Sequence, residues 1–237
     1  MTIAAVFLDV DGVINDHALN PGMWDAHFGE VLAPVLGGDA RAWGKANRAV
    51  FPAIWAQNES WGTDPMTRIR IEAAETIGAM AEYLGMARPA PDQCFDLLRA
   101  ADVHIAATAE AAFPFAAEAI RALAARLPVH TATGNPSWRV EALLNGLGVR
   151  ELVGVLAGPD LVNIWKGGPV YYERVFAAAE VAPAEALVVD DSEKCLAWAA
   201  EAGAQTAHIT SEACPCPATR HLATLAEVPA LELIADR

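Results

Sequence analysis

Three short apolar runs constrain the fold of this chain more than any other feature. They lie at Ala4–Leu8, Val129–Thr133 and Ala186–Val189, and each is typical of a strand buried on both faces of a parallel sheet. Alanine-rich helical stretches flank them, at Ala116–Arg126, Val170–Glu180 and Lys194–Ala202. This alternation predicts an α/β fold with an open parallel sheet and right-handed crossovers.

The segment between the first two runs is too long for a simple crossover, because such connections are usually short. Within it, Arg41–Trp55 and Met66–Leu84 carry apolar residues at the three- and four-residue spacing of amphipathic helices. We therefore expect residues 1–16 and 109–237 to form an α/β core domain. Residues 17–108 are predicted to form an inserted, all-helical domain.

Composition and charge exclude several classes of protein. The 237-residue chain has a formal net charge of −14, which argues against a nucleic-acid partner, since phosphate backbones require a basic face. The net charge does not exclude a small phosphorylated ligand, because such a ligand needs positive charge at one point only. The apolar runs are far shorter than the ~20 residues of a membrane span, and the N-terminus lacks the features of a secretory signal. We expect a cytoplasmic protein without a membrane partner.

The four cysteines show no disulfide framework. Cys214-Pro-Cys216, with His221 five residues on, has the form of half a zinc site, but no second pair follows. A surface loop is the favoured interpretation of this segment.

Polar residues follow the end of each apolar run, where the ligands of open α/β sheets bind. The first run leads into Asp9 and Asp11, the second ends at Thr133, and the third leads into Asp190 and Asp191. Side chains two residues apart in a strand point the same way, so Asp9 and Asp11 would repel each other at short range. Such crowding calls for a positively charged partner.

Together with a lysine, these residues form four motifs in order along the chain. The motifs are Asp9-Val10-Asp11-Gly12-Val13, Thr133-Gly134-Asn135, Lys166 and Asp190-Asp191-Ser192. Motifs of this kind, in this order and at strand or helix ends, resemble the haloacid dehalogenase (HAD) superfamily of phosphatases and phosphotransferases. The resemblance covers nearly the whole core and implies a Rossmann-like open sheet with a helical cap inserted after the first motif.

The resemblance implies a phosphoryl-transfer mechanism with Mg2+ as cofactor. Asp9 would be the nucleophile that becomes an aspartyl phosphate, and Asp11 would serve as general acid and then as general base. Mg2+ would lie between Asp9, the backbone carbonyl of Asp11 and the acid Asp191. Asp190 is a further candidate ligand.

The other two motifs would stabilise charge. Thr133 would hydrogen-bond a phosphoryl oxygen, helped by the backbone N–H of Gly134 or Asn135, and Thr131 competes for this role. Lys166 would neutralise the nucleophile and the phosphoryl oxygens. The two glycines that follow Lys166 depart from the usual Lys-Pro-x-Pro pattern of the family and make the loop looser.

Asp11 favours phosphate ester hydrolysis among the reactions of the family, because an alkoxide leaving group needs a proton and a halide does not. A 2-haloacid dehalogenase is therefore disfavoured. Phosphonate hydrolases of the family use a lysine from the inserted domain, and Lys45 is the only lysine in that part of this chain, so this activity is disfavoured as well. A phosphomutase acting on a sugar phosphate is the main alternative. A non-catalytic binding protein is less favoured because all four motifs are present.

The helical domain is expected to close over a small phosphorylated metabolite and to exclude water. Its hinges would lie near Ile14–Leu19 and Thr108–Phe113. Trp24, Arg68 and Arg70 are candidates for contacting the substrate, since arginine suits phosphate and carboxylate groups. The expected assembly is a monomer or homodimer, and the sequence does not identify the substrate.

Overall fold

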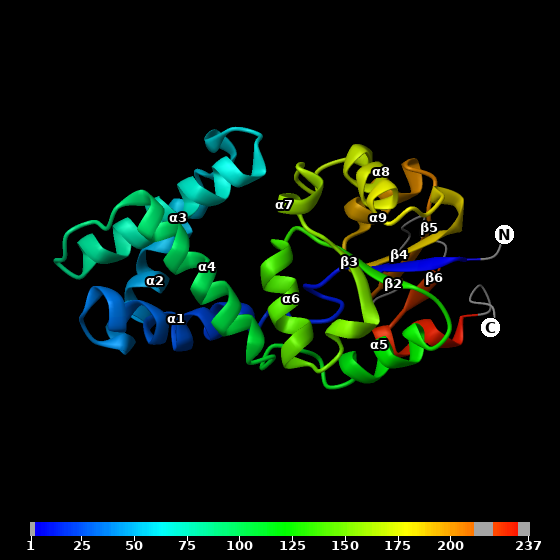
Figure 1. Cartoon of the computed structure of the whole chain (residues 1–237), viewed down its shortest axis with the longest axis horizontal. Coiled ribbons are helices and arrows are strands. Elements are labelled where there is room, and N and C mark those ends of the chain that lie inside the picture. Colours follow the sequence, from blue (N-terminus) through cyan, green and yellow to red (C-terminus); the bar gives the residue numbers. More distant parts are fainter. Residues whose placement is uncertain (1–2, 211–219, 232–237) are drawn as a thin grey trace. The chain divides into compact units, whose positions relative to one another are not determined.

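The computed structural model describes residues 3–210 and 220–231, which leaves Cys214 and Cys216 outside the described residues. The chain divides into two compact units, coloured by sequence in Figure 1. The α/β unit comprises Met1–His17 and Ala112–Arg237, and the helical unit comprises Ala18–Ala111. The α/β fold class predicted from the sequence is confirmed.

The α/β unit contains, within the described residues, a six-stranded parallel sheet with the order β3-β2-β1-β4-β5-β6. Its strands are β1 (Ala5–Leu8), β2 (Val129–Ala132), β3 (Val153–Ala157), β4 (Ala186–Asp190), β5 (Gln205–Ile209) and β6 (Arg220–Leu222). Strands β1, β2 and β4 are buried along their whole length, as the apolar runs predict. The other three strands have exposed or partly exposed positions, and the sequence pattern did not reveal them.

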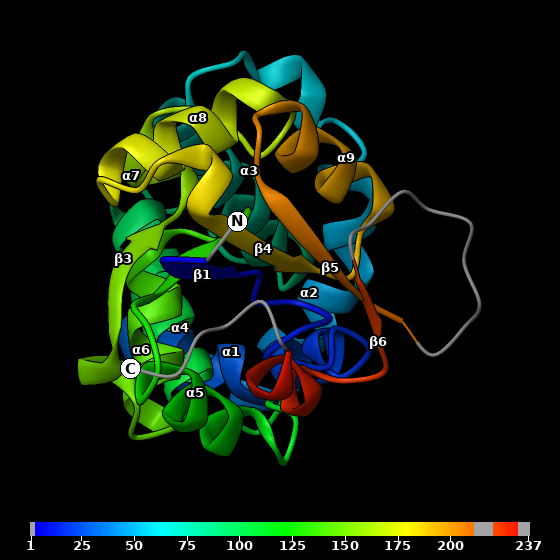
Figure 2. The same cartoon turned by 90° about the vertical axis from the view of Figure 1, so that its right-hand side faces the viewer.

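Helices cover both faces of this sheet (Figure 2). They are α5 (Ala116–Ala124), α6 (Ser137–Gly146), α7 (Pro159–Val162), α8 (Pro169–Ala178), α9 (Glu193–Glu201) and the short 3-10 helix η4 (Leu225–Ala230). On one face, Phe7 and Val188 of the sheet share a buried cluster with Tyr172 and Phe176 of α8 and Leu196 of α9. On the other face, α5 packs against β2 and η4. Short 3-10 turns at Arg150–Leu152 and Pro183–Glu185 lead into β3 and β4.

The helical unit consists of α1 (Asn20–Leu36), α2 (Ala40–Trp55), α3 (Pro65–Tyr83) and α4 (Pro91–Ala107), with a 3-10 turn at Asn58–Trp61. Helices α1 and α3 each pack against both α2 and α4 (Figure 1). Its core holds Trp43, Phe28 and Met80, all nearly inaccessible to solvent. A Cβ on Gly44 would lie 1.9 Å from the Asp25 carbonyl oxygen, so glycine permits the close crossing of α1 and α2. Among the described residues, we find no helix with the length and apolar character of a membrane span.

Candidate active site

The order of the strands places a switch point between β1 and β4. Strands β2 and β3 lie on one side of β1, and β4, β5 and β6 lie on the other. Ligands of open α/β sheets bind beyond the carboxyl ends of the strands at such a point. Leu8 pairs with Val189, and the Asp9 N–H donates to the Val189 carbonyl at 2.9 Å. Asp9, directly after β1, and Asp190, the last residue of β4, therefore lie side by side at this edge of the sheet.

Asp9, Asp190 and Asp191 bring three carboxylates together, and we call them the acid cluster. One oxygen from each lies within 4.8 Å of the others, and Asp190 is completely buried. The Lys166 ammonium nitrogen lies 2.7 Å from Asp190 Oδ2 and 3.1 Å from Asp9 Oδ1. The two glycines between Lys166 and the start of α8 at Pro169 thus do not prevent the lysine from reaching the acids.

Burial dominates the electrostatics of this cluster. Burial raises the pKa of Asp9 from 3.8 to about 6, a rise that Lys166 opposes and Asp190 reinforces. Burial also raises the pKa of Asp190 and that of Asp191. Burial alone would lower the pKa of Lys166, but the charges of Asp9 and Asp190 raise it well above its usual value. A single ammonium therefore faces the buried carboxylates of Asp9 and Asp190, and the half-buried Asp191 lies beside them.

This donor set fits a hard divalent cation. All three side chains of the acid cluster offer carboxylate oxygens, which are the ligands that Mg2+ prefers. The excess of negative over positive charge in the cluster is what a divalent ion would offset. Asp9, Asp190 and Asp191 are the side chains that would hold Mg2+, and the part of the Asp11 backbone carbonyl stays a prediction.

Asp11 lies in a different setting from the one that strand geometry predicts. Strand β1 ends at Leu8, so the alternation that would align Asp9 with Asp11 does not extend to them. The Asp11 carboxylate instead accepts a hydrogen bond from the Asn135 side-chain amide at 2.9 Å. The largest like-charge effect on Asp9 comes from Asp190. The expected crowding of carboxylates is present, but between the ends of β1 and β4.

Gly12 allows the backbone after Asp11 to pass close to Asp191. Its φ is +83°, and a Cβ there would lie 2.0 Å from Asp191 Oδ2. The Gly12 N–H donates to the Asn15 carbonyl at 2.7 Å, which closes the turn. His17 places Nδ1 3.6 Å from the same Asp191 oxygen, and its charge lowers the pKa of Asp191 against the effect of burial. His17 was not predicted from the sequence.

The second motif follows the end of β2. Thr133 Oγ1 accepts hydrogen bonds from the backbone N–H and the side-chain amide of Asn135, at 3.2 and 3.3 Å. A Cβ on Gly134 would meet no atom within 4 Å, so the loop is open at this point. Thr131 lies inside β2, where it pairs with Leu8 and is completely buried. Because Thr131 lies within the sheet, Thr133 is the better candidate for the hydrogen bond to a phosphoryl oxygen.

Two further residues support this motif and were not predicted. Arg139 of α6 donates from Nη1 to the Asn135 side-chain oxygen at 3.0 Å, which orients the amide that holds Asp11. The Tyr171 hydroxyl of α8 lies 2.9 Å from the Thr133 carbonyl and 2.8 Å from that of Ala157. The Tyr171 contacts join residues 38 and 14 positions apart, and Arg139, four positions after Asn135, lies outside the motif itself.

The three predicted substrate-contacting residues belong to the helical unit. Arg70 forms an exposed ion pair with Asp92, with 3.3 Å between Nη1 and Oδ1. The Trp24 ring packs edge-on against Phe28, with 5.0 Å between the ring centres. Arg68 is half-buried on α3. Their contribution to substrate binding stays a prediction.

A family model described as haloacid dehalogenase-like hydrolase matches residues 3–203. No curated protein matches the sequence.

Solved structures share the fold along almost the whole chain. The HAD-hydrolase YfnB from Bacillus subtilis, bound to magnesium, has a TM-score of 0.67 and 13% identity, covering 96% of this chain and 97% of its own. The L-2-haloacid dehalogenase from Xanthobacter autotrophicus with covalently bound chloropropionic acid has a TM-score of 0.61 and 15% identity, covering 97% and 98%. CbbY from Rhodobacter sphaeroides in complex with phosphate has a TM-score of 0.58 and 24% identity, covering 96% of each chain. At these identities the likeness establishes the fold and leaves the reaction open.

Proposed function

We propose a magnesium-dependent phosphatase activity for this chain, which belongs to the haloacid dehalogenase-like hydrolase family. The substrate would be a small phosphorylated metabolite, hydrolysed through an aspartyl phosphate on Asp9. The observation that carries this proposal is the setting of Asp11. Its half-buried carboxylate follows the nucleophile by two residues and is oriented by Asn135 at 2.9 Å. A positioned acid of this kind serves a leaving group that must receive a proton.

The proposed reaction has two steps. In the first, an Asp9 carboxylate oxygen forms a bond to phosphorus, the bond from phosphorus to the ester oxygen breaks, and Asp11 gives its proton to the departing alkoxide. In the second, the Asp11 carboxylate takes a proton from a water molecule whose oxygen attacks phosphorus. The bond between phosphorus and Asp9 then breaks, inorganic phosphate leaves, and both aspartates return to their starting states.

The surrounding residues supply charge and orientation. Lys166 would face the nucleophile and the negative oxygens of the phosphoryl group with a permanent positive charge. Thr133 and the open Gly134 loop would donate hydrogen bonds to the same oxygens. Arg139 would act as a positioning residue, because it orients the Asn135 amide that holds Asp11. When bound to the acid cluster, Mg2+ would stabilise the negative charge shared by substrate and carboxylates.

Dehalogenation of a 2-haloacid is the second candidate, and it stands higher than the sequence alone suggested. Several structures that share this fold are dehalogenases, one of them with chloropropionic acid covalently bound. In that reaction Asp9 would attack carbon, and halide would leave without a proton. That reaction gives no role to the Asp11 carboxylate as a proton donor and does not require a metal ion at Asp190 and Asp191, which is why we favour the phosphatase. A phosphomutase would share the first step and pass the phosphoryl group to a sugar hydroxyl instead of water.

Parallel assays on the full chain separate these candidates. Phosphate release from a generic aryl phosphate is measured with Mg2+ and with EDTA, and halide release from 2-chloropropionate is measured under the same conditions. We expect Mg2+-dependent phosphate release by the wild type, loss of this activity in Asp9→Asn and in Asp11→Asn, and full activity in the exposed control Asp96→Asn. Halide release that survives EDTA and the Asp11→Asn change would show that the chain is a dehalogenase.

A further inference from the structure

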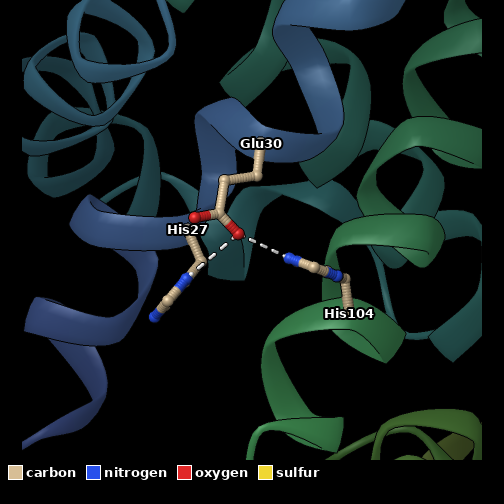
Figure 3. Close-up of side chains that lie close together, drawn as sticks. All are labelled: His27, Glu30 and His104. Atoms are coloured by element: carbon tan, nitrogen blue, oxygen red, sulfur yellow. Dashed lines mark hydrogen bonds and ion pairs between the residues drawn. The ribbon is translucent and has the colours of Figure 1, made fainter.

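The helical unit holds a second cluster of potential metal ligands, which has no part in the proposed reaction. His27, Glu30 and His104 each place one ligand atom within 4.8 Å of the others. Figure 3 shows the Glu30 carboxylate between the two imidazoles, with a dashed contact to each. Glu30 Oε2 lies 3.1 Å from His27 Nδ1 and 2.7 Å from His104 Nε2.

Two helices that are distant in the sequence build this cluster. His27 and Glu30 are three residues apart on α1, so they share one face of that helix. His104 lies in the last turn of α4. Because α1 packs against α4, the three side chains converge although 77 residues separate the two histidines along the chain. This spacing explains why no sequence motif indicates the site.

The distances suit a tetrahedral ion. Zinc binds imidazole nitrogen and carboxylate oxygen at about 2.0–2.1 Å, which separates neighbouring ligand atoms by roughly 3.3 Å in a tetrahedron. The two nitrogen–oxygen distances of the cluster, 3.1 and 2.7 Å, are close to this separation before any ion draws the groups into place. Two imidazoles with one carboxylate form a borderline donor set that suits Zn2+. The acid cluster, in contrast, offers only carboxylate oxygens, which suit Mg2+.

A fourth residue supplies an independent indication. His27 points its other ring nitrogen, Nε2, toward a carboxylate oxygen of Glu110 at 3.6 Å. Histidines that bind metals commonly donate their second N–H to a carboxylate, which fixes the tautomer and leaves the first nitrogen free to coordinate. When an ion is bound, Glu110 would hold the proton on Nε2, and the Nδ1 that lies 3.1 Å from Glu30 would turn its lone pair to the ion. The arrangement therefore has both a ligand set and the outer carboxylate that orients it.

We propose that His27, Glu30 and His104 bind a zinc-type divalent ion, with Glu110 as the positioning residue for His27. Glu30 and His104 are exposed and His27 is half-buried, so the ion can enter from solvent and keep a fourth position for water. The ion would join α1 to α4, the first and last helices of the helical unit. Occupancy would therefore stabilise that unit without taking part in phosphoryl transfer.

Cobalt(II) binding to the full chain tests this proposal through its visible absorption, independently of activity. Cys214, Cys216 and His221 are another potential zinc-binding group, so every protein carries Cys214→Ser and Cys216→Ser. Excess Mg2+ is present to occupy the acid cluster. We expect one Co2+ per chain, with the absorption of four- or five-coordinate nitrogen and oxygen ligands, and displacement of Co2+ by Zn2+.

Single substitutions in this background assign the ligands. Glu30→Gln and His104→Ala should fail to bind Co2+ at concentrations that saturate the parent, and Glu110→Gln should weaken binding by about 10- to 100-fold. Asp96→Asn removes an exposed carboxylate from α4 outside the cluster and should bind like the parent. Circular dichroism checks that each variant is folded, and Glu30→Gln preserves the side-chain shape. Parent-like binding by folded Glu30→Gln and His104→Ala, or no binding by the parent, would overturn the proposal and leave the cluster as hydrogen bonds between two helices.

Discussion

Replacing Asp9 with asparagine should abolish turnover and also stabilise the metal-free protein. Burial raises the pKa of this carboxyl from 3.8 to about 6, so its ionised form is less favourable in the fold than in the unfolded chain. The contribution of Asp9 to the stability of the metal-free wild type therefore falls as the pH rises from about 4 through 6. One pKa unit corresponds to about 1.4 kcal/mol. At a pH above both pKa values, the ionised Asp9 therefore lowers the free energy of unfolding by about 3 kcal/mol.

The attraction of Lys166 is already included in this figure, because Lys166 opposes the rise in the pKa of Asp9. Asparagine keeps the shape of the side chain, but it gives up the ion pair in which Lys166 lies 3.1 Å from Asp9. Lys166 retains Asp190 at 2.7 Å, so it does not lose all of its charge partners. We therefore expect Asp9→Asn to raise the free energy of unfolding in EDTA by about 1–3 kcal/mol.

Urea denaturation near neutral pH, in EDTA and in millimolar Mg2+, measures this effect. Mg2+ should stabilise the wild type more than Asp9→Asn, because an ion that binds only the native state shifts the unfolding equilibrium. Asp92→Asn is the control, since it removes an exposed carboxylate paired with Arg70 and should change stability by less than about 1 kcal/mol. A clear loss of stability in EDTA for Asp9→Asn would refute the electrostatic reasoning, and retained turnover would refute the role of Asp9 as nucleophile.

Three further predictions follow from the same contacts. Gly12→Ala places a Cβ against the Asp191 carboxylate at a positive φ, so it should destabilise the fold by roughly 1–3 kcal/mol in urea denaturation and weaken Mg2+ binding in a calorimetric titration. Asn135→Ala removes the donor to Asp11 and should lower kcat for an aryl phosphate by about tenfold or more, with a change in the pH–rate profile; an unchanged profile would argue that the amide does not position the acid. Burial lowers the pKa of His130, whose Nδ1 accepts a hydrogen bond from the Val155 N–H, so protonation of the unfolded chain should reduce stability as the pH falls below about 6.5. His130→Asn should show a shallower loss of stability between pH 7 and pH 5, roughly across the reference pKa of histidine, and equal slopes would contradict this account.

The central strands and the acids that follow them could be predicted from local sequence. The segments of β1 and β4 are buried at every position, so they read as continuous apolar runs, and parallel pairing then brings the residues after them to one edge. Strands β3 and β5 are only partly buried, and the three-residue β6 lies at the edge of the sheet. Half-exposed strands tolerate polar residues, which hides them from a search for apolar runs.

The supporting contacts could not be predicted in this way. Tyr171 contacts the Thr133 carbonyl, 38 residues away in sequence, because α8 packs on the sheet. The same hydroxyl also contacts the Ala157 carbonyl at the end of β3. Arg139 reaches Asn135 only because α6 starts directly after the second motif and turns its side chain back. The expectation that Asp9 and Asp11 point the same way was wrong because it assumed that the strand continues past Leu8.

The most direct test of the central claim is the identity of the group that becomes attached to Asp9. The full chain carrying Asp11→Asn, which should slow hydrolysis of the intermediate, is mixed with an aryl phosphate and Mg2+, quenched in acid and mapped by peptide mass spectrometry. A parallel sample receives 2-chloropropionate. The account predicts a phosphoryl group on the peptide that contains Asp9, dependent on Mg2+ and absent from the doubly substituted Asp9→Asn, Asp11→Asn protein. A carboxyalkyl group on that peptide after exposure to the haloacid, with no phosphoryl group in the first sample, would contradict it.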